Sequence, residues 1–273
     1  MSIIQADCLE FLKGVPDKTY NLIYLDPPFN TGILQTKTTV KMNRSIEGRE
    51  GFSGKTYSVQ ALATQQYNDY FSDYYGFLFP RLEELYRVLA DDGSMFIHLD
   101  WRETHYVRVF LDSLFGRDNC LNEIIWHWDY GAKSKAYWPR KHNNVLYYVK
   151  DTENYTFDIS QTDFLPYLAP KLVTKEKAER GKVPTDTWFL TIVPTNGHEK
   201  TGYPTQKPEA LLRRILACHC KPGDKVLDPF AGSGTTGAVA QKLGLEFTMV
   251  DENPEAIRIM QERLYPPSYE ELG

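Results

Sequence analysis

The sequence contains few cysteines and no long apolar segment. Its 273 residues include four Cys, and their spacing does not suggest a disulfide framework. No run of 18 apolar residues is present, and the first residues lack the apolar region of a secretory signal peptide. These absences argue against a disulfide-stapled secreted scaffold and against a helical membrane protein. They predict a cytoplasmic protein with reduced thiols and no membrane partner.

A metal-binding motif is also missing. The nearest approach to one is the triplet Cys218-His219-Cys220. A zinc site needs a second pair of ligands at a suitable spacing, and no such pair is evident. The triplet follows an expected helix, so it is interpreted as core packing, and no metal is expected.

Excess positive charge is absent from the chain as a whole, which has a net charge of −5. The charge is nevertheless unevenly distributed. Residues 131–150 carry five Lys and Arg with no acid, residues 31–66 have a local charge of +3, and residues 67–100 have a local charge of −5. A basic face on an acidic body is suited to phosphate contacts, although solvated lysine-rich loops would give the same pattern.

Apolar segments alternate between the strand and helix types along the chain. This alternation predicts an α/β fold with a mainly parallel sheet. The expected strands are residues 22–25, 94–99, 123–128, 145–149, 225–227 and 247–250. The expected helices are residues 70–89, 104–114, 209–218, 235–243 and 254–264.

Two stretches interrupt this pattern. Residues 33–66 are polar and rich in Gly, Ser and Thr, which predicts a long, mobile loop. Residues 151–200 have only short apolar runs and are interpreted as a variable insert. The chain is therefore expected to comprise residues 1–150 with the loop, the insert 151–200, and a second half of the same domain at 201–273.

A glycine-rich turn follows the strand expected at residues 225–227. The segment KVLDPFAGSGTTG places Gly232, Gly234 and Gly237 in the pattern G-x-G-x-x-G, and Asp251 follows 19 residues after the first of them. Glycine permits close approach of the backbone to a ligand, and a later acid can bind ribose hydroxyls, so the pattern predicts a nucleoside cofactor. Asp228 disfavours a pyrophosphate and suits a ligand with a positive end, such as S-adenosylmethionine.

A second chemical motif, DPPF, follows the strand expected at residues 22–25. Asp26 and the carbonyl of Pro27 can each accept a hydrogen bond from an amine, and neither Pro27 nor Pro28 has an N–H. The ring of Phe29 can stack on a planar base. The alternative is that the strand simply ends in a rigid turn.

Together the two motifs resemble those of the S-adenosylmethionine-dependent amino-methyltransferases that modify exocyclic nitrogens of DNA bases. The order, with DPPF first and the glycine-rich turn last, is that of the β class, which includes type III modification subunits and stand-alone bacterial enzymes. The resemblance covers most of residues 1–30, 67–150 and 200–265. It implies a seven-stranded, mainly parallel, methyltransferase-like sheet with helices on both faces and a small inserted recognition region. The residues that it implies are catalytic are Asp26, Pro27, Pro28 and Phe29. The residues that it implies bind the cofactor are Asp7, Cys8, Thr205, Gln206, Lys207, Asp228, Phe230, Ala231, Gly232, Ser233, Gly234, Thr235, Asp251 and Asn253.

The resemblance implies transfer of a methyl group from S-adenosylmethionine to a base flipped out of double-stranded DNA. No enzyme nucleophile is needed, which agrees with the absence of a Pro-Cys motif and argues against cytosine-C5 methylation. Asp at the first motif position is more typical of adenine-N6 enzymes, with cytosine N4 as the alternative. A homodimer and a separate cognate endonuclease are further expectations. A catalytically inactive DNA-binding partner is a different class, and a nicotinamide oxidoreductase is disfavoured by Asp228.

Several residues outside the two motifs are candidates for contacts. Lys133, Lys135, Arg140 and Lys141 are the expected contacts to the DNA backbone. Trp126, Trp128, Tyr130 and Trp138 lie beside or within this basic stretch and suit either unstacked bases or the core. His98 and Asp100 end a strand, where a structural role or a cofactor contact is favoured over general-base catalysis.

Overall fold

The computed structural model describes residues 1–50, 56–69, 71–194 and 196–266 of the chain. It divides into two compact units. The larger combines residues 1–29 with the chain from residue 75 onward, and the smaller comprises residues 30–74.

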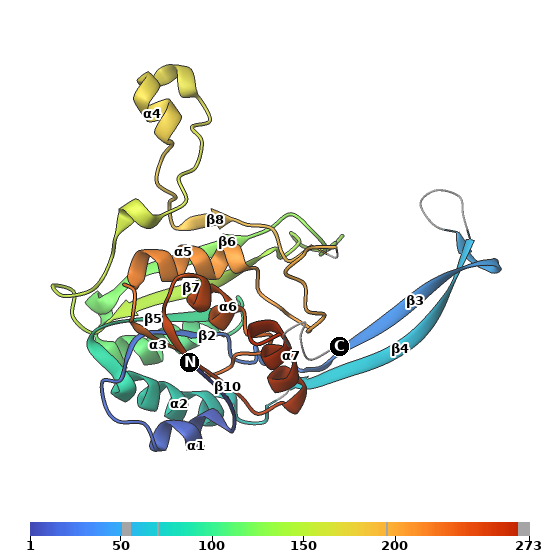
Figure 1. Ribbon diagram of the computed structural model, residues 1–273, viewed down its shortest axis with the longest axis horizontal. Helices are drawn as coiled ribbons and strands as arrows, with labels where there is room; N and C mark the ends of the chain where they lie inside the picture. The colour runs from blue at the N-terminus through green and yellow to red at the C-terminus, as the bar shows by residue number, and fades with distance from the viewer. Residues whose placement is uncertain (51–55, 70, 195, 267–273) are drawn as a thin grey trace, which may run out of the picture. The chain divides into compact units, whose positions relative to one another are not determined.

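The larger unit is built on an eight-stranded sheet in the order β1-β10-β9-β2-β5-β7-β6-β8 (Figure 1). The strands are β1 (Ser2–Gln5), β2 (Tyr20–Leu25), β5 (Leu89–Leu99), β6 (Cys120–His127), β7 (His142–Val149), β8 (Thr187–Phe189), β9 (Lys225–Asp228) and β10 (Glu246–Asp251). Only β7 runs antiparallel to both of its neighbours, and the other pairs are parallel. The predicted α/β fold with a mainly parallel sheet is therefore confirmed.

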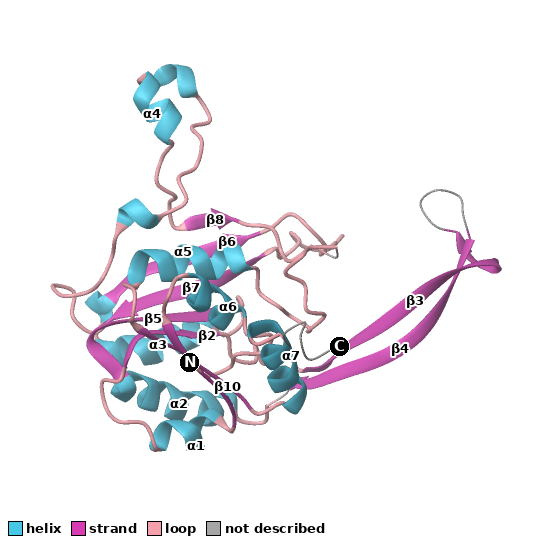
Figure 2. Cartoon of the chain, in the orientation of Figure 1, coloured by secondary structure: helices cyan, strands magenta, loops and turns pink. Residues whose placement is uncertain are grey.

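Helices follow the strands and cover the sheet (Figure 2). The α-helices are α1 (Cys8–Lys13), α2 (Tyr74–Val88), α3 (Thr104–Phe115), α4 (Lys175–Arg180), α5 (Glu209–His219), α6 (Thr235–Lys242) and α7 (Pro254–Leu264). Short 3-10 helices are η1 (Arg117–Asn119), η2 (Ile159–Gln161) and η3 (Pro170–Leu172). Within the described residues, no helix combines the length and apolar character needed to span a bilayer.

Helices cover both faces of the sheet, and successive side chains of each strand point to opposite faces. Strand β7 shows this clearly. Tyr147 packs against His219 at the end of α5, whereas Tyr148 packs against Phe115 and donates a hydrogen bond to Asp112, both on α3. The helices α5 and α3 therefore lie on opposite faces, as predicted.

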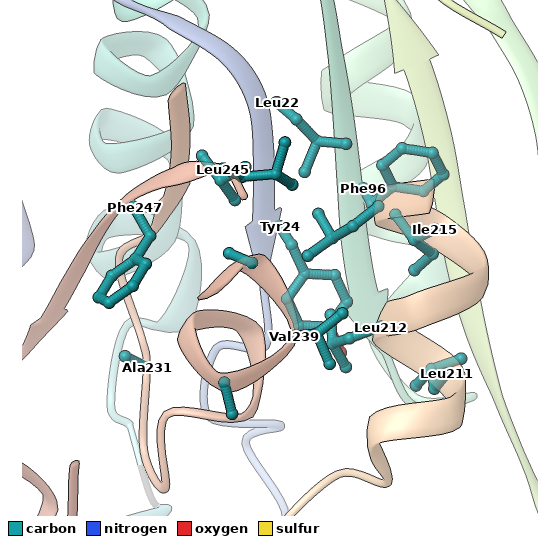
Figure 3. Packing of buried hydrophobic residues seen from close by; sticks show 14 of the residues in the cluster. Leu22, Tyr24, Phe96, Leu211, Leu212, Ile215, Ala231, Val239, Leu245 and Phe247 are labelled. Carbon is teal, nitrogen blue, oxygen red and sulfur yellow. The ribbon is translucent and has the colours of Figure 1, made fainter. Parts of the chain in front are cut away.

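The core between α5, α6 and the sheet holds the central strands in place. Figure 3 shows Leu211, Leu212 and Ile215 of α5 directed toward Tyr24 of β2 and Phe96 of β5. All five side chains are buried. Burial of one such side chain stabilises the fold by roughly 1.5–3 kcal/mol, so this layer fixes the position of the strand that ends at the DPPF motif.

The sheet has eight strands where seven were expected, and β1 and β8 were not among the six strands predicted by residue. β8 is a three-residue edge strand within the region interpreted as an insert. Most of residues 151–186 is irregular apart from α4, η2 and η3. Arg214 of α5 forms an ion pair with Asp163 and connects this region to the core.

The smaller unit corrects the expectation of a long loop at residues 33–66. Residues in β3 (Ile33–Glu50) and β4 (Thr56–Asp69) form an antiparallel pair, whose register runs from Ile33 opposite Asp69 to Glu50 opposite Thr56. The segment is rich in Thr and Val as well as Gly and Ser, and β-branched residues favour strands. The polar composition concealed this preference.

Candidate active site

Three carboxylates come together at one edge of the sheet. The parallel strands β2, β9 and β10 end at Leu25, Asp228 and Asp251, and Asp26 follows directly after β2. Ligands of open α/β sheets bind at the carboxyl ends of parallel strands. The fold therefore brings the two motifs of the sequence to the same edge, although about 200 residues separate them.

The DPPF motif is connected to the segment that precedes α5. The ammonium of Lys207 forms an ion pair with the carboxylate of Asp26, and both side chains are largely buried, with 10% and 18% of their surface exposed. The same ammonium lies 5.3 Å from the ring centroid of Phe29, within the range of a cation–π contact. The expected catalytic residues Asp26 and Phe29 thus share one cationic neighbour.

The ring of Phe29 is supported by His98, the penultimate residue of β5. The two ring centroids are 5.8 Å apart. Both nitrogens of His98 have partners, since Nδ1 lies 2.8 Å from the hydroxyl of Tyr24 and Nε2 lies 2.9 Å from the amide nitrogen of Asn143. Complete burial lowers the pKa of His98 well below its usual value, and the charge of Lys207 lowers this pKa further. A neutral ring with two occupied nitrogens is structural, in agreement with the favoured interpretation.

The glycine-rich turn between β9 and α6 has the backbone geometry of a ligand-binding loop. Gly232 and Gly234 have φ angles of +50° and +71°, a region that residues with a side chain rarely adopt. A Cβ at Gly234 would lie 2.7 Å from Cγ of Met260 in α7. The amide of Gly232 donates a 2.8 Å hydrogen bond to the carboxylate of Asp251. The acid after β10 therefore stabilises the loop itself.

Asp228 is the most perturbed carboxyl group at this edge. It accepts hydrogen bonds from the hydroxyl of Thr236 at 2.5 Å and from the amide of Phe230 at 3.1 Å. Burial raises the pKa of Asp228 to about 7, and the charges of Asp26 and Asp251 also raise it. Burial raises the pKa of Asp251 as well. A cationic ligand group would relieve this concentration of negative charge, so the donor set fits the sulfonium and amine of S-adenosylmethionine.

The segment at residues 199–208 is folded against the glycine-rich turn. The Gln206 side chain accepts hydrogen bonds from the amide and hydroxyl of Thr201, and it donates one to the carbonyl of Glu199. The carbonyl of Lys207 accepts a hydrogen bond from the hydroxyl of Thr235 at 3.1 Å. Thr205 has a φ of +60°, an unusual conformation for a β-branched residue. The structure therefore places Thr205, Gln206 and Lys207 beside the turn.

Asp7 and Cys8 lie next to Asp251 because β1 pairs with β10, with Gln5 opposite Asp251. The Asp7 side chain caps α1 by accepting hydrogen bonds from two backbone amides, and its other oxygen pairs with Arg81. Cys8 is buried, and burial raises its thiol pKa to about 12. The side chains of Asp7 and Cys8 thus have structural roles here.

The remaining expected cofactor residues lie in or beside the same turn. Ser233 and Thr235 are buried, and Arg263 donates hydrogen bonds to the Ser233 carbonyl and to the Thr235 hydroxyl. Asn253 begins α7 as its N-cap, and its amide donates a hydrogen bond to Asp251. Ala231 donates from its amide to the carbonyl of Val250. The Arg263 contacts connect the turn to α7, the Ala231 contact connects it to β10, and the Asn253 contact joins α7 to β10.

The predicted DNA-contacting residues lie in the connection between β6 and β7. Because β7 is antiparallel to β5, with Asn144 opposite Leu99, this connection lies at the same edge as the DPPF motif. Arg140 lies over the ring of Trp101, 3.8 Å from its centroid. Lys141 pairs with Asp129. Lys133, Lys135, Arg140 and Lys141 are partly or fully exposed.

The triplet Cys218-His219-Cys220 belongs to the core. His219 is buried between the rings of Phe96, Tyr147 and Phe157, and burial lowers its pKa to about 4. Among the described residues, no group of three or more His, Cys, Asp or Glu is arranged to hold a metal.

Sequence reasoning missed three contributors to the site. Asn143 contacts His98, Tyr24 lies beneath the DPPF turn, and Arg263 supports the glycine-rich turn. Tyr24 lies in the strand expected at residues 22–25, whereas Asn143 lies in the part of β7 that precedes the strand expected at 145–149. A polar residue in a buried strand was the available signal for Asn143, but its partner could be identified only from the register.

The mainly parallel sheet, with a glycine-rich turn at the carboxyl ends of its strands, defines the class as an α/β methyltransferase with a turn suited to a nucleoside cofactor. Comparison with known proteins is consistent with this class and identifies the family. The sequence profile of the N6/N4 DNA methylase family matches residues 20–262. The chain therefore belongs to this family of DNA methyltransferases, for which S-adenosylmethionine is the methyl donor.

Individual relatives align over nearly the whole chain. The DNA adenine methyltransferase YhdJ of Escherichia coli K12 is 32% identical, and the alignment covers 96% of this chain and 82% of the relative. The type II methyltransferase M.HpaI of Haemophilus parainfluenzae is 29% identical, with 96% and 73% covered.

Solved structures share the fold at lower identity. The M1.HpyAVI–SAM complex has a TM-score of 0.61 at 21% identity and covers 97% of this chain and 98% of its own. The cytosine-N4-specific PvuII DNA methyltransferase has a TM-score of 0.65 at 17% identity, with 99% and 89% covered. These similarities confirm the predicted methyltransferase fold.

Proposed function

We propose that this protein transfers a methyl group from S-adenosylmethionine to the exocyclic N6 of adenine in double-stranded DNA, after the base leaves the helix. The observation that carries the proposal is the position of Asp26. It follows β2 at the edge where Asp228 and Asp251 end the neighbouring strands, and it contacts Lys207 from the cofactor segment. An amine acceptor and a nucleoside-binding turn are thereby brought to one site.

The chain's own residues would hold the amine in a reactive orientation. The carboxylate of Asp26 and the carbonyl of Pro27 accept the two N–H groups, which directs the nitrogen lone pair toward the methyl donor. Phe29, supported by His98, stacks on the flipped base. Pro27 and Pro28 contribute no N–H that could compete for these acceptors.

S-adenosylmethionine supplies an electrophilic methyl group on a sulfonium. The buried Asp228 is suited to its positive end, and Asp251 is suited to the ribose hydroxyls. Lys207 is suited to the carboxylate of its methionine part, which would compete with Asp26 for the same ammonium. Gly232 allows the ring of Tyr203 to lie close to the backbone of the turn, because a Cβ at this position would lie 3.1 Å from that ring.

We further propose that three regions contact DNA. Lys133, Lys135, Arg140 and Lys141 contact the phosphates, since they are concentrated at the active-site edge. Residues 151–200 read the target sequence, because they form a largely irregular region where relatives of this type would differ. The hairpin of β3 and β4 contributes further contacts, in keeping with its basic composition.

Two findings favour adenine over cytosine. Asp occupies the first position of the motif, and the adenine methyltransferase YhdJ is 32% identical over 96% of this chain. Cytosine N4 is the second candidate, because its amine can use the same two acceptors and because the PvuII enzyme shares the fold.

The proposal is tested by incubating the protein with isotopically labelled S-adenosylmethionine and unmethylated genomic DNA, followed by mass spectrometry of the nucleosides. We expect labelled N6-methyladenine from the wild type and none from Asp26→Ala. Labelled N4-methylcytosine would establish the second candidate instead. Cofactor binding without any labelled nucleoside would point to an inactive DNA-binding protein and would overturn the proposal.

A further inference from the structure

The connection between β6 and β7, residues 128–141, is a loop stabilised by its own hydrogen bonds. The amide of Trp128 donates to the carbonyl of Lys141, and the Lys141 ammonium donates to the carbonyl of Asp129, both at 3.1 Å. Farther along, the hydroxyl of Ser134 accepts hydrogen bonds from the amides of Ala136 and Tyr137. The loop therefore presents its side chains in a defined arrangement.

The loop is located beside the catalytic motif. It leads into Asn143, which contacts His98, and His98 supports the ring of Phe29. On the other side, Arg140 lies over Trp101, two residues after the end of β5. Since β7 is the neighbour of β5 and β5 is the neighbour of β2, the loop begins at most a few strands from the one that leads into DPPF, at the same end of the sheet.

Trp138 is the unusual residue of this loop, because 93% of its surface is exposed. In contrast, 3% of Trp126 and 8% of Trp188 are exposed. An indole is a large apolar surface whose burial normally stabilises a protein substantially. Within the described part of the chain, Arg140 covers the rings of Trp101 and Tyr137, whereas no cation or ring covers Trp138.

The charges around Trp138 indicate the chemistry of its partner. Lys133, Lys135, Arg140 and Lys141 surround it in sequence, and residues 131–150 contain no acid. An uncovered aromatic ring among cations suits nucleic acid, in which phosphates flank stacked bases. An apolar protein surface would not account for this run of positive charge.

We propose that Trp138 inserts into the base stack of duplex DNA at the position that the target nucleotide leaves. Flipping a base breaks its stacking on both sides, and an aromatic ring that fills the gap replaces part of that lost stacking. Lys133, Lys135 and Arg140 would hold the phosphates on either side. This inference rests on the proposed function, because it requires a flipped base.

The first experiment measures flipping directly. The recognition site is obtained by sequencing methylated DNA, and 2-aminopurine replaces the target base in a duplex. We expect the wild type to increase the 2-aminopurine emission, Trp138→Phe to retain most of the increase, and Trp138→Ala to lose it. Trp138→Lys is the matched control, since it keeps a long side chain and adds charge without a ring. We expect it to bind DNA and to fail to flip the base.

The kinetic result should agree with the optical one. Because stacking of a base on an aromatic ring is worth about 1–3 kcal/mol, kcat/KM of Trp138→Ala on a fully paired duplex should fall by about 5- to 150-fold. A substrate in which the target base is mispaired should recover most of this loss, since less energy is needed to unstack it. Equal loss on both substrates would contradict an insertion role.

A second readout does not depend on methyl transfer. Trp138 should account for most of the acrylamide-accessible tryptophan emission, and duplex DNA should quench or protect that emission in the wild type but not in Trp138→Phe. If Trp138→Ala flips and methylates like the wild type, the proposal is overturned. It is also overturned if the substitution alters only the association of the protein with itself in size-exclusion chromatography. By contrast, if the proposed function is wrong, the wild-type protein itself will produce no methylated nucleoside.

Discussion

Lys207 and Asp26 form an ion pair across 181 residues of sequence, and this contact joins the DPPF motif to the segment folded against the glycine-rich turn. Asp26 belongs to the motif that would hold the target amine, and Lys207 belongs to the segment folded against the glycine-rich turn. The pair connects the two functions physically. A cofactor carboxylate that binds Lys207 would leave Asp26 available for the amine, so cofactor and base binding are expected to be coupled.

The clearest consequence concerns Asp26. Asp26→Ala removes the main amine acceptor, so we expect kcat to fall by at least about 100-fold. Cofactor binding should be retained and should not weaken, because the substitution leaves the glycine-rich turn intact and frees Lys207 for the cofactor carboxylate. Calorimetric titration with S-adenosylmethionine and a methylation assay separate the two effects. Methylation by Asp26→Ala at the wild-type rate would show that the catalytic assignment is wrong.

The contribution of the Lys207–Asp26 ion pair to stability can be measured with Lys207→Met. This variant leaves the largely buried Asp26 carboxylate without its cation, and breaking such a pair commonly costs about 3–5 kcal/mol of stability when burial is complete. We expect a smaller loss here, about 1–3 kcal/mol in urea unfolding, because both groups keep some exposure. In the double variant with Asp26→Asn, most of this loss should be absent. Additive losses would show that the pair contributes nothing.

Asp228 should make stability depend on pH. Its pKa is raised to about 7 in the folded protein, so the folded state binds a proton more tightly than the unfolded state. The part of the free energy of unfolding that comes from this proton is therefore present at low pH and is lost as the pH rises through about 7. Relative to Asp228→Asn, the wild type should lose up to about 4 kcal/mol between pH 4 and pH 8, since each pKa unit corresponds to about 1.4 kcal/mol. Urea unfolding at several pH values measures this difference.

The same group should also affect cofactor binding. A cationic ligand favours the ionised carboxylate, so binding releases a proton and the affinity of the wild type should rise as pH increases through 7. The Asp228→Asn variant should show weaker binding without this rise. Parallel pH profiles for the two proteins would exclude a contact between Asp228 and the positive end of the ligand.

Asp251 is expected to act on the cofactor in two ways. It would bind ribose hydroxyls, and it accepts a hydrogen bond from Gly232 that stabilises the turn. Asp251→Ala should therefore weaken S-adenosylmethionine binding by about 10- to 100-fold, corresponding to one or two hydrogen bonds to a charged group. Glu252→Ala is a matched control at the next, exposed position and should leave the affinity unchanged. Unchanged affinity in Asp251→Ala would remove its proposed role.

Gly234 offers a test of the turn's packing. Gly234→Ala introduces strain at a φ of +71° and a contact of 2.7 Å with Met260. Gly223→Ala introduces strain at a φ of +90° with nothing within 4 Å, so it isolates the backbone effect. We expect losses of about 1–2 kcal/mol for Gly223→Ala and about 2–4 kcal/mol for Gly234→Ala. Equal losses in urea unfolding would show that Met260 moves away at little cost.

The sequence predicted most of the larger unit because its strands are short apolar runs and its longer helices follow helical apolar patterns, with the predicted Asn253 N-cap at α7. The helix expected at residues 254–264 agrees with α7 (Pro254–Leu264), and that expected at 209–218 agrees closely with α5. The strands at the two edges of the sheet were harder to predict from the sequence. β1 and β8 contain four and three residues, and such short segments carry little periodic signal. The β3–β4 hairpin was missed because its polar composition resembled that of a loop.

The sequence by itself determined the chemistry of the two turns. Prolines without an N–H, glycines that tolerate positive φ, and acids at strand ends are properties of local covalent structure, so they can be recognised without a fold. Only the tertiary structure decided which residues meet. The exposure of Trp138 depends on which side chains pack around its loop. Strand order and register decide the ion pair of Lys207 with Asp26 and the support of Phe29 by His98. Such contacts join residues far apart in the chain, and no local pattern encodes them.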